Sequence, residues 1–131
     1  MKVVLDTNVL ISATLWDGSV AQKLLYSLIR EDADIFSSIE LLEEYNKVLK
    51  RDFQYNDIEI NRVINVILSF VKIVEPLEHL DTIKSDPEDN KVLECAAASS
   101  SKFIFTYDKH LLSLKNFRDI RIIKPEEILR K

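Results

Sequence analysis

Glycine is nearly absent from this chain of 131 residues, and Gly18 is the only one. Phosphate-binding loops of the P-loop and Rossmann types need several glycines, because the backbone must approach the phosphate closely. The sequence therefore argues against nucleotide binding by either route.

Cysteine is equally scarce. Cys95 has no second cysteine with which to form an internal disulfide, as is usual in the reducing cytoplasm. It lies beside Ala96 and Ala97, so a packed thiol is favoured over a nucleophile. No stretch approaches the roughly 18 uninterrupted apolar residues of a membrane span, and the first residues lack the pattern of a signal peptide. We therefore expect a cytoplasmic protein with no membrane partner.

An excess of positive charge is also missing, since the formal net charge is -4. Passive nucleic-acid binding usually needs a basic face, so this charge argues against it. An enzyme that gathers acids around a divalent cation is compatible with the charge, because the ion reverses the local field. The length and the apolar share of 47% indicate one globular domain over residues 1–131.

Short apolar runs alternate with amphipathic helical patterns along the chain. Strands are expected at 2–5, 34–38, 71–74, 103–105 and 121–123. Helices are expected at 19–31, 39–51, 57–70, 86–100 and 108–114, with an irregular connection at 77–85 and a helical turn from Pro125. Continuous apolar strands separated by helices are typical of a parallel sheet covered on both faces, so the pattern predicts an α/β fold.

Two of these strands end in a carboxylate. Asp6 follows the first strand, and Asp108 follows the fourth within Thr106-Tyr107-Asp108. Ligands of α/β proteins bind at the carboxyl edge of the sheet, so the two acids suggest a metal or phosphate site. Each acid is also suited to cap a following helix, which is the alternative interpretation. Thr106 is placed to hydrogen-bond a neighbouring carboxylate or a water on a metal.

Helical geometry selects one acid from the segment 39–51. The apolar stripe of this helix contains Leu41, Leu42, Tyr45, Val48 and Leu49. At ~100° per residue, Glu44 lies ~100° from that stripe, whereas Glu40 and Glu43 lie at ~140° and ~160°. Glu44 is therefore predicted to reach a cleft beside the core, and the other two to face solvent.

The sequence Asp86-Pro87-Glu88-Asp89 has the features of a helix start, with Asp86 as the N-cap. Asp89 is different, because it aligns with the inward-facing apolar positions that follow it. Acids are uncommon in such a line unless they are paired or liganded, so we favour a ligand role for Asp89. Asn90 is expected to add a polar contact.

Asp6, Glu44, Asp89 and Asp108 would repel one another in a cluster without a cation. Mg²⁺ and Mn²⁺ favour carboxylate and water oxygens, so the four acids predict a site for one of these ions. Neither histidine has the spacing of a zinc ligand, and His110 is expected on the surface of its short helix.

Four motifs resemble, in order and over the whole chain, those of the PIN-domain family. They are Val3-Val4-Leu5-Asp6-Thr7-Asn8, Glu44-Tyr45 with Val48-Leu49, the segment 86–96, and Thr106-Tyr107-Asp108. The resemblance implies a three-layer α/β/α sandwich with a five-stranded parallel sheet in the order 3-2-1-4-5. It also implies Mg²⁺- or Mn²⁺-dependent endonucleolytic cleavage of single-stranded RNA by Asp6, Glu44, Asp89 and Asp108.

The same resemblance implies further roles and partners. Asn8 and Thr106 are expected to be supporting polar groups, and Asp86 an accessory acid. Small prokaryotic members similar to this chain are VapC-like toxins of type II toxin–antitoxin pairs, which implies an antitoxin in the acidic groove and a homodimer.

Basic residues near the acids are candidates for steering the RNA backbone, with ordinary solvated surface as the alternative interpretation. They are Lys47, Lys50, Arg51 and Lys109. Tyr107 is a candidate for stacking on a base or, equally, for packing at the strand end.

Other functions compete with the nuclease interpretation, and a response-regulator receiver is the weakest of them because its paired acids after the first strand are absent. A phosphatase of the haloacid-dehalogenase type also begins with an acid after its first strand, but it needs a second acid two residues on, where this chain has Asn8. A PIN-like module that binds RNA or a protein without catalysis stays open, because only metal binding or cleavage separates it from the enzyme.

Overall fold

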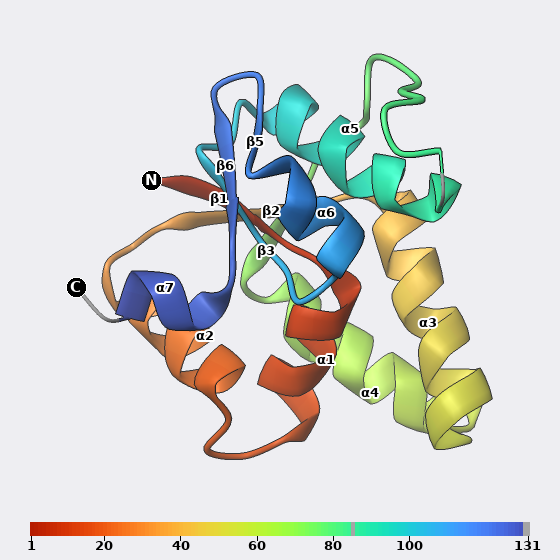
Figure 1. Cartoon of the computed structure of the whole chain (residues 1–131). Helices are drawn as coiled ribbons and strands as arrows, with labels where there is room; N and C mark the ends of the chain where they lie inside the picture. The colour runs from red at the N-terminus through yellow and green to blue at the C-terminus, as the bar shows by residue number, and fades with distance from the viewer. Residues whose placement is uncertain (85, 130–131) are drawn as a thin grey trace.

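The structure, a computed structural model, describes residues 1–84 and 86–129. A six-stranded sheet forms its centre, in the order β3-β2-β1-β4-β6-β5. The parallel strands are β1 (Lys2–Leu5), β2 (Asp34–Ser37), β3 (Val71–Ile73), β4 (Phe103–Phe105) and β6 (Ile120–Ile123). Helices cover both faces of this sheet (Figure 1), so the predicted three-layer α/β fold is confirmed.

The helices alternate with the strands along the chain. They are α1 (Thr7–Leu15), α2 (Val20–Arg30), α3 (Ile39–Phe53), α4 (Asp57–Leu68), α5 (Asn90–Ser99), α6 (Lys109–Leu114) and α7 (Pro125–Leu129). Val3 and Leu5 of β1 pack into a core shared with α1, α2, α3 and α4. Val4, which points to the opposite face, packs into a second core with α5 and α6.

The prediction of a five-stranded sheet is corrected by one short strand. β5 (Asn116–Phe117) pairs antiparallel with β6 at the edge of the sheet, and the five parallel strands keep the predicted order. Lys115 and Arg118 flank β5 with positive φ angles of 61° and 55°. Such angles usually favour glycine, and glycine is the usual sequence signal for a hairpin. This hairpin has Lys115 and Arg118 at these positions, so the sequence gives no such signal.

Two helices also differ from the prediction. α1 was absent from the predicted elements, because it buries Val9, Leu10 and Ile11 in succession and so has no amphipathic stripe. The helix predicted at 86–100 begins as a 3₁₀ turn over Pro87–Asp89 before α5.

The remaining connection follows the prediction. Residues 77–84 form an irregular segment, and Ser85 lies outside the described residues. In the described part of the chain, no helix has the length and apolar character needed to cross a membrane.

The carboxyl ends of β1 and β4 lie side by side at the centre of the sheet. Leu5 pairs with Phe105 in the parallel ladder, and the backbone N–H of Asp6 donates to the Phe105 carbonyl at 3.0 Å. The residues that follow each strand therefore meet at one edge, which places Asp6 next to Thr106.

Candidate metal centre

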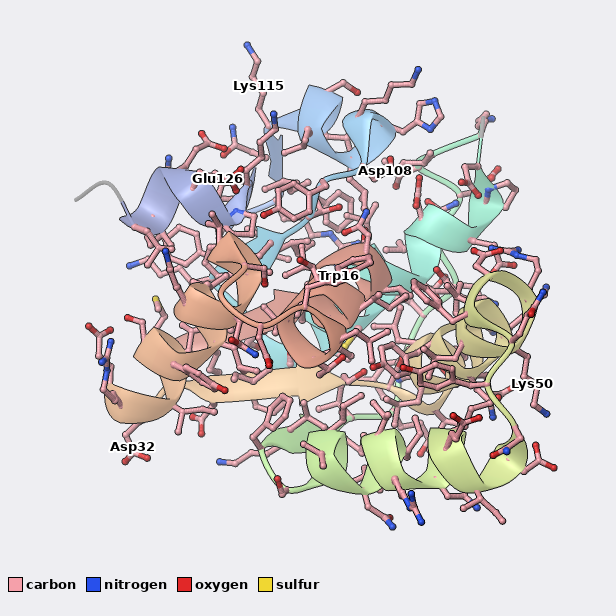
Figure 2. The ribbon with its side chains drawn as sticks, turned by 90° about the horizontal axis from the view of Figure 1, so that it is seen from below. Trp16, Asp32, Lys50, Asp108, Lys115 and Glu126 are labelled. Carbon is pink, nitrogen blue, oxygen red and sulfur yellow. The ribbon has the colours of Figure 1, made fainter. Side chains whose placement is uncertain are left out.

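A cavity of about 200 Å³ lies at the carboxyl edge of β1 and β4. Its wall includes the four acids that the sequence singled out, Asp6, Glu44, Asp89 and Asp108. Figure 2 shows Asp108 where α6 begins, beside the first turn of α5. The fold therefore gathers acids from four separate segments around one small space.

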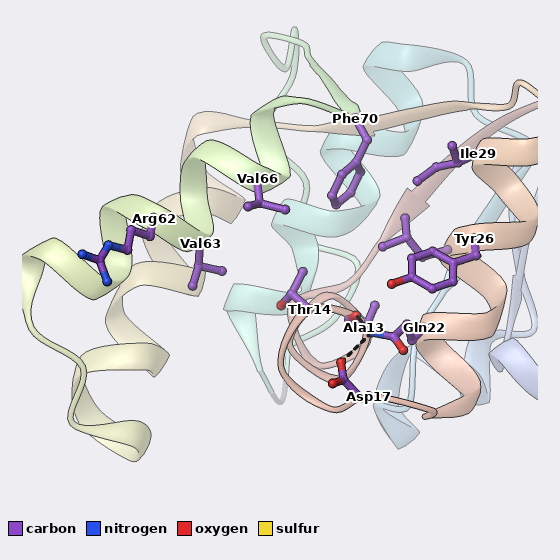
Figure 3. Close-up of a pocket in the computed structure, with 11 residues that line it drawn as sticks. Ala13, Thr14, Asp17, Gln22, Tyr26, Ile29, Arg62, Val63, Val66 and Phe70 are labelled. Atoms are coloured by element: carbon purple, nitrogen blue, oxygen red, sulfur yellow. Dashed lines mark hydrogen bonds between the residues drawn. The ribbon is translucent and has the colours of Figure 1, made fainter.

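A larger hollow of about 460 Å³ lies between α1, α2 and α4 (Figure 3). Its wall is mainly apolar and includes Ile29, Val66 and Phe70. Its charged residues are Asp17, which accepts a hydrogen bond from Gln22, and Arg62. One carboxylate and one guanidinium do not form an acidic cluster, so the smaller cavity is the candidate metal centre.

Both carboxylate oxygens of Asp6 are held by hydrogen bonds. The Thr7 N–H donates to Oδ1 at 2.8 Å, so Asp6 does cap α1, and the Thr106 hydroxyl donates to Oδ2 at 2.6 Å. Burial raises the pKa of Asp6, although these two hydrogen bonds lower it, and the charges of Asp108 and Asp86 raise it further. The Asp6 side chain is thus fixed in direction, and both groups that donate to its carboxylate are neutral.

Asp89 lies in a cluster with Asp86, Asp108 and His110, whose ligand atoms all fall within 4.8 Å of one another. Asp89 is 8% exposed, and its Oδ2 atom has no hydrogen-bond partner among the described residues. Burial, then the charges of Asp108, Asp86 and Asp6, raise the pKa of Asp89 to about 8. A buried carboxylate oxygen without a hydrogen-bond donor is suited to bind a divalent cation. Mg²⁺ and Mn²⁺ both take carboxylate oxygens as ligands, so either ion would give this oxygen a partner.

Glu44 reaches the same cavity from α3, as the helix geometry predicted. Leu41, Tyr45 and Leu49 are buried on one side of this helix, and Glu43 is exposed. Burial, followed by the charge of Asp6, raises the pKa of Glu44.

Two of the four predicted supporting residues line the cavity, and they are Asn8 and Asp86. The Asn8 Oδ1 atom accepts from the Tyr107 N–H at 3.3 Å, which ties the start of α1 to the β4 end. Asp86 caps the 3₁₀ turn, where Oδ1 accepts from the Glu88 N–H at 3.3 Å.

Asn90 makes polar contacts, as predicted, but it makes them away from the cavity. Its buried amide bonds both polar groups of the Ile83 backbone at 2.8 Å, and so anchors the irregular connection instead of facing the cavity.

Comparison with known proteins was decisive for the family. The sequence profile described as PIN domain matches residues 2–110. The chain belongs to the PIN-domain family. It is also similar to the uncharacterised protein MJ1680 of Methanocaldococcus jannaschii, with 31% identity over 120 residues that cover 88% of this chain and 76% of that protein.

Solved structures share the fold of this PIN domain. VapBC2 from Rickettsia felis, bound to a DNA fragment from its promoter, matches with a TM-score of 0.67 and 14% identity over 93% of this chain and 97% of that one. VapC20 from Mycobacterium tuberculosis, a toxin that cleaves the sarcin–ricin loop, matches with a TM-score of 0.63 and 14% identity over 91% and 98%.

The sequence predicts His110 on the surface of its short helix. The structure places it in the cluster with Asp86, Asp89 and Asp108. Its Nδ1 atom lies 3.9 Å from Asp89 Oδ2 and 3.8 Å from Asp108 Oδ1 in this PIN domain. The sequence does indicate that His110 lies near Asp108, because Asp108 caps α6 and His110 lies in the first turn of that helix. That His110 also meets Asp89 depends on how α5 and α6 pack together.

Cations flank the acids on the α3 side of the PIN domain. Lys47, Arg51 and Lys91 line an adjoining hollow of about 350 Å³, which shares Glu44, Arg51 and Asp86 with the acidic cavity. Glu40 also lines this hollow and is half-buried, so the prediction that it faces solvent is only partly right. Lys50 is not among these residues, and its Nζ lies 3.2 Å from a carboxylate oxygen of Asp57.

Thr106 is the residue that connects the two strand-end acids. It is fully buried, donates to Asp6, and accepts from the Asp108 N–H at 2.9 Å. Thr106→Val should lower the free energy of unfolding by about 2 kcal/mol, because a buried carboxylate oxygen and an N–H lose their partner. Urea denaturation would measure the change, with exposed Thr82→Val as the control. A loss below about 0.5 kcal/mol would contradict the importance of this connection.

Proposed function

We propose that this PIN domain is a divalent-metal-dependent endoribonuclease that hydrolyses phosphodiester bonds of single-stranded RNA. The observation that carries the proposal is the gathering of Asp6, Glu44, Asp89 and Asp108 around one cavity. The family supports it, since PIN domains are generally nucleases and VapC20, which has the same fold, cleaves an RNA loop.

The donor set fits Mg²⁺ or Mn²⁺. Asp6, Asp89 and Asp108 would hold the ion, with Glu44 and Asp86 on the flank. A bound divalent cation would activate the attacking water and stabilise negative charge on the reacting phosphate.

The protein's own contribution is orientation. Thr7 and Thr106 fix the two oxygens of Asp6, and the N–H groups of His110 and Leu111 fix Oδ1 of Asp108 at 2.8 and 3.2 Å. Carboxylates held in this way need no rearrangement when the cation and substrate bind, which lowers the cost of reaching the transition state.

RNA must approach an acidic edge, so nearby cations matter. Lys47, Arg51 and Lys91 line the hollow next to the cavity, and we assign them to the phosphates beside the scissile bond. Arg51 pairs with Asp52 and Lys91 with Glu88, both at 2.8 Å, and exposed ion pairs of this kind are weak enough to exchange for a phosphate. The exposed Lys109 flanks the other side, next to Asp108. Lys50 is given no such role because it does not line this hollow. Tyr107 is assigned to packing, since its hydroxyl donates to Glu126 at 2.9 Å.

The biological role that we propose is that of a VapC-like toxin, held inactive by an antitoxin and assembled as a homodimer. The similarity in fold to VapBC2 and VapC20 supports this assignment. Growth arrest on expression, relieved by an adjacent antitoxin gene, would test the toxin role, and the solution mass would test the dimer.

The cleavage experiment compares two neighbouring glutamates of α3. With a labelled single-stranded RNA and Mn²⁺, Glu44→Gln should lower the cleavage rate about 100-fold, which corresponds to about 2.7 kcal/mol. Glu43→Gln is the matched control, because it removes the same charge from an exposed position on the same helix, one that lines the adjoining hollow but not the acidic cavity. EDTA should abolish cleavage by every variant.

Two results would contradict the proposal. Equal rates for the two variants would remove Glu44 from the site. Metal-independent background on several RNAs would instead favour a PIN-like module that binds RNA or a protein without cleaving.

A further inference from the structure

His110 brings the only nitrogen donor into the group of carboxylates formed by Asp86, Asp89 and Asp108, as far as the described residues show. Its Nδ1 atom is buried, although 41% of the side chain is exposed, so the ring turns this nitrogen inward. The rest of the imidazole lies at the mouth of the cluster.

The inward nitrogen is not satisfied by the protein. Nδ1 has no hydrogen-bond partner among the described residues, and Asp89 Oδ2, 3.9 Å away, has none either. Separations of 3.8 and 3.9 Å to Asp108 and Asp89 are too long for hydrogen bonds. The carboxylate oxygen of Asp89 and the imidazole nitrogen of His110 thus lie near one another, and neither has a hydrogen-bond partner among the described residues.

The separations of Nδ1 from Asp89 and Asp108 are compatible with one shared cation. Two atoms bound to one ion at about 2.1 Å each can be at most about 4.2 Å apart, and both observed distances fall below that limit. An ion pair between protonated His110 and the carboxylates would instead draw the nitrogen to within about 3 Å of an oxygen.

We propose that His110 Nδ1 is a ligand of the divalent cation held by Asp89 and Asp108, and that it sets the metal preference of the site. The inference rests on the proposed metal site and adds a nitrogen to a set otherwise made of oxygens. Imidazole suits transition metals, whereas Mg²⁺ prefers carboxylate, carbonyl and water oxygens. Mn²⁺ shares the preference of Mg²⁺ for oxygen ligands, but as a first-row transition metal it accepts an imidazole nitrogen more readily, so His110 favours Mn²⁺ over Mg²⁺.

The test uses bound Mn²⁺ as a probe of its own ligands. Electron spin echo spectra of the Mn²⁺-loaded protein should contain nitrogen modulation from a coordinated imidazole. This signal should vanish in His110→Ala and persist in His79→Ala, which replaces the other, exposed histidine. No turnover is needed for this readout.

Titration calorimetry gives the thermodynamic counterpart. His110→Ala should weaken Mn²⁺ binding about 10-fold and change Mg²⁺ binding by less than about twofold, whereas His79→Ala should change neither. Because the wild-type spectrum alone can reveal the nitrogen, the test does not depend on the folding of a variant.

The possible failures are distinguishable. Mn²⁺ binding without nitrogen modulation, or with equal affinities in wild type and His110→Ala, would overturn the role of His110 and leave the nuclease proposal intact. Failure of the wild-type protein to bind Mn²⁺ or Mg²⁺ would overturn both.

Discussion

Asp6→Asn should lower the rate of RNA cleavage at least about 1000-fold at saturating Mn²⁺, a loss of about 4 kcal/mol in transition-state stabilisation. The amide has the same shape as the carboxylate, but it carries no negative charge for the cation. Its oxygen can still accept from the Thr7 N–H at the start of α1, so the cap that holds the helix is retained. The amide NH₂ takes the place of Oδ2, and the Thr106 hydroxyl can turn to accept from it. The expected defect is therefore chemical and not a loss of folding.

Asp17→Asn is the matched control for this experiment. Asp17 lies just beyond the other end of α1, on the wall of the apolar hollow, and is exposed. Its rate should stay within about twofold of wild type, and both variants should unfold at nearly the same urea concentration. In cells, growth arrest should be lost with Asp6→Asn and kept with Asp17→Asn. Retention of more than about a tenth of the activity by Asp6→Asn would exclude the acidic cavity as the catalytic centre.

The site was predictable where its signals are local. An apolar run that ends in an acid places Asp6 and Asp108 at the strand ends, and the helical period of α3 separates Glu44 from Glu43. These inferences needed only the period of one element and the rule that parallel strands present their carboxyl ends to one edge.

Other features depend on contacts between distant segments. Asn90 has the composition of a site residue, but its amide is used by Ile83, seven positions earlier in an irregular connection. His110 meets Asp89 only because α5 and α6 pack on the same face of the sheet. No pattern within a single element reports such a contact, so the sequence alone could not name the partner of either residue.

The helices and strands also divide into those with a local sequence signal and those that depend on packing. α1 was missed because its apolar residues surround the helix, and burial on several sides removes the amphipathic period. β5 was missed because its turns use Lys115 and Arg118 in place of glycine. In both cases packing overrides the local signals from which elements are predicted.

Asp89→Asn should abolish cleavage to the same extent as Asp6→Asn, yet it should stabilise the cation-free protein at pH 8. The pKa of Asp89 is raised to about 8 in the folded chain, against about 3.9 in an unfolded one. The folded state therefore binds the proton more tightly between about pH 4 and pH 8, and its stability falls as pH rises through that window. Asparagine cannot ionise, so this fall should become smaller.

Urea unfolding in EDTA at pH 5 and pH 8 would measure this effect. At pH 8 the free energy of unfolding of Asp89→Asn should exceed that of wild type by roughly 1 to 3 kcal/mol, and the difference should shrink at pH 5. Asp17→Asn should follow wild type at both values. A variant less stable than wild type at pH 8 would mean that the protein itself compensates the charge of Asp89.

Mn²⁺ should reverse the order of stability. A cation that binds only the folded state stabilises wild type by an amount that rises with the logarithm of its concentration, and Asp89→Asn should gain far less. Asp89 stands at the N-cap of α5 but makes no capping hydrogen bond with its side chain, so a structural cap cannot produce this reversal. Asp6 and Asp108 each cap a helix, whereas Asp89 does not. Its charge, costly to the empty fold, is explained by the ion that it would hold.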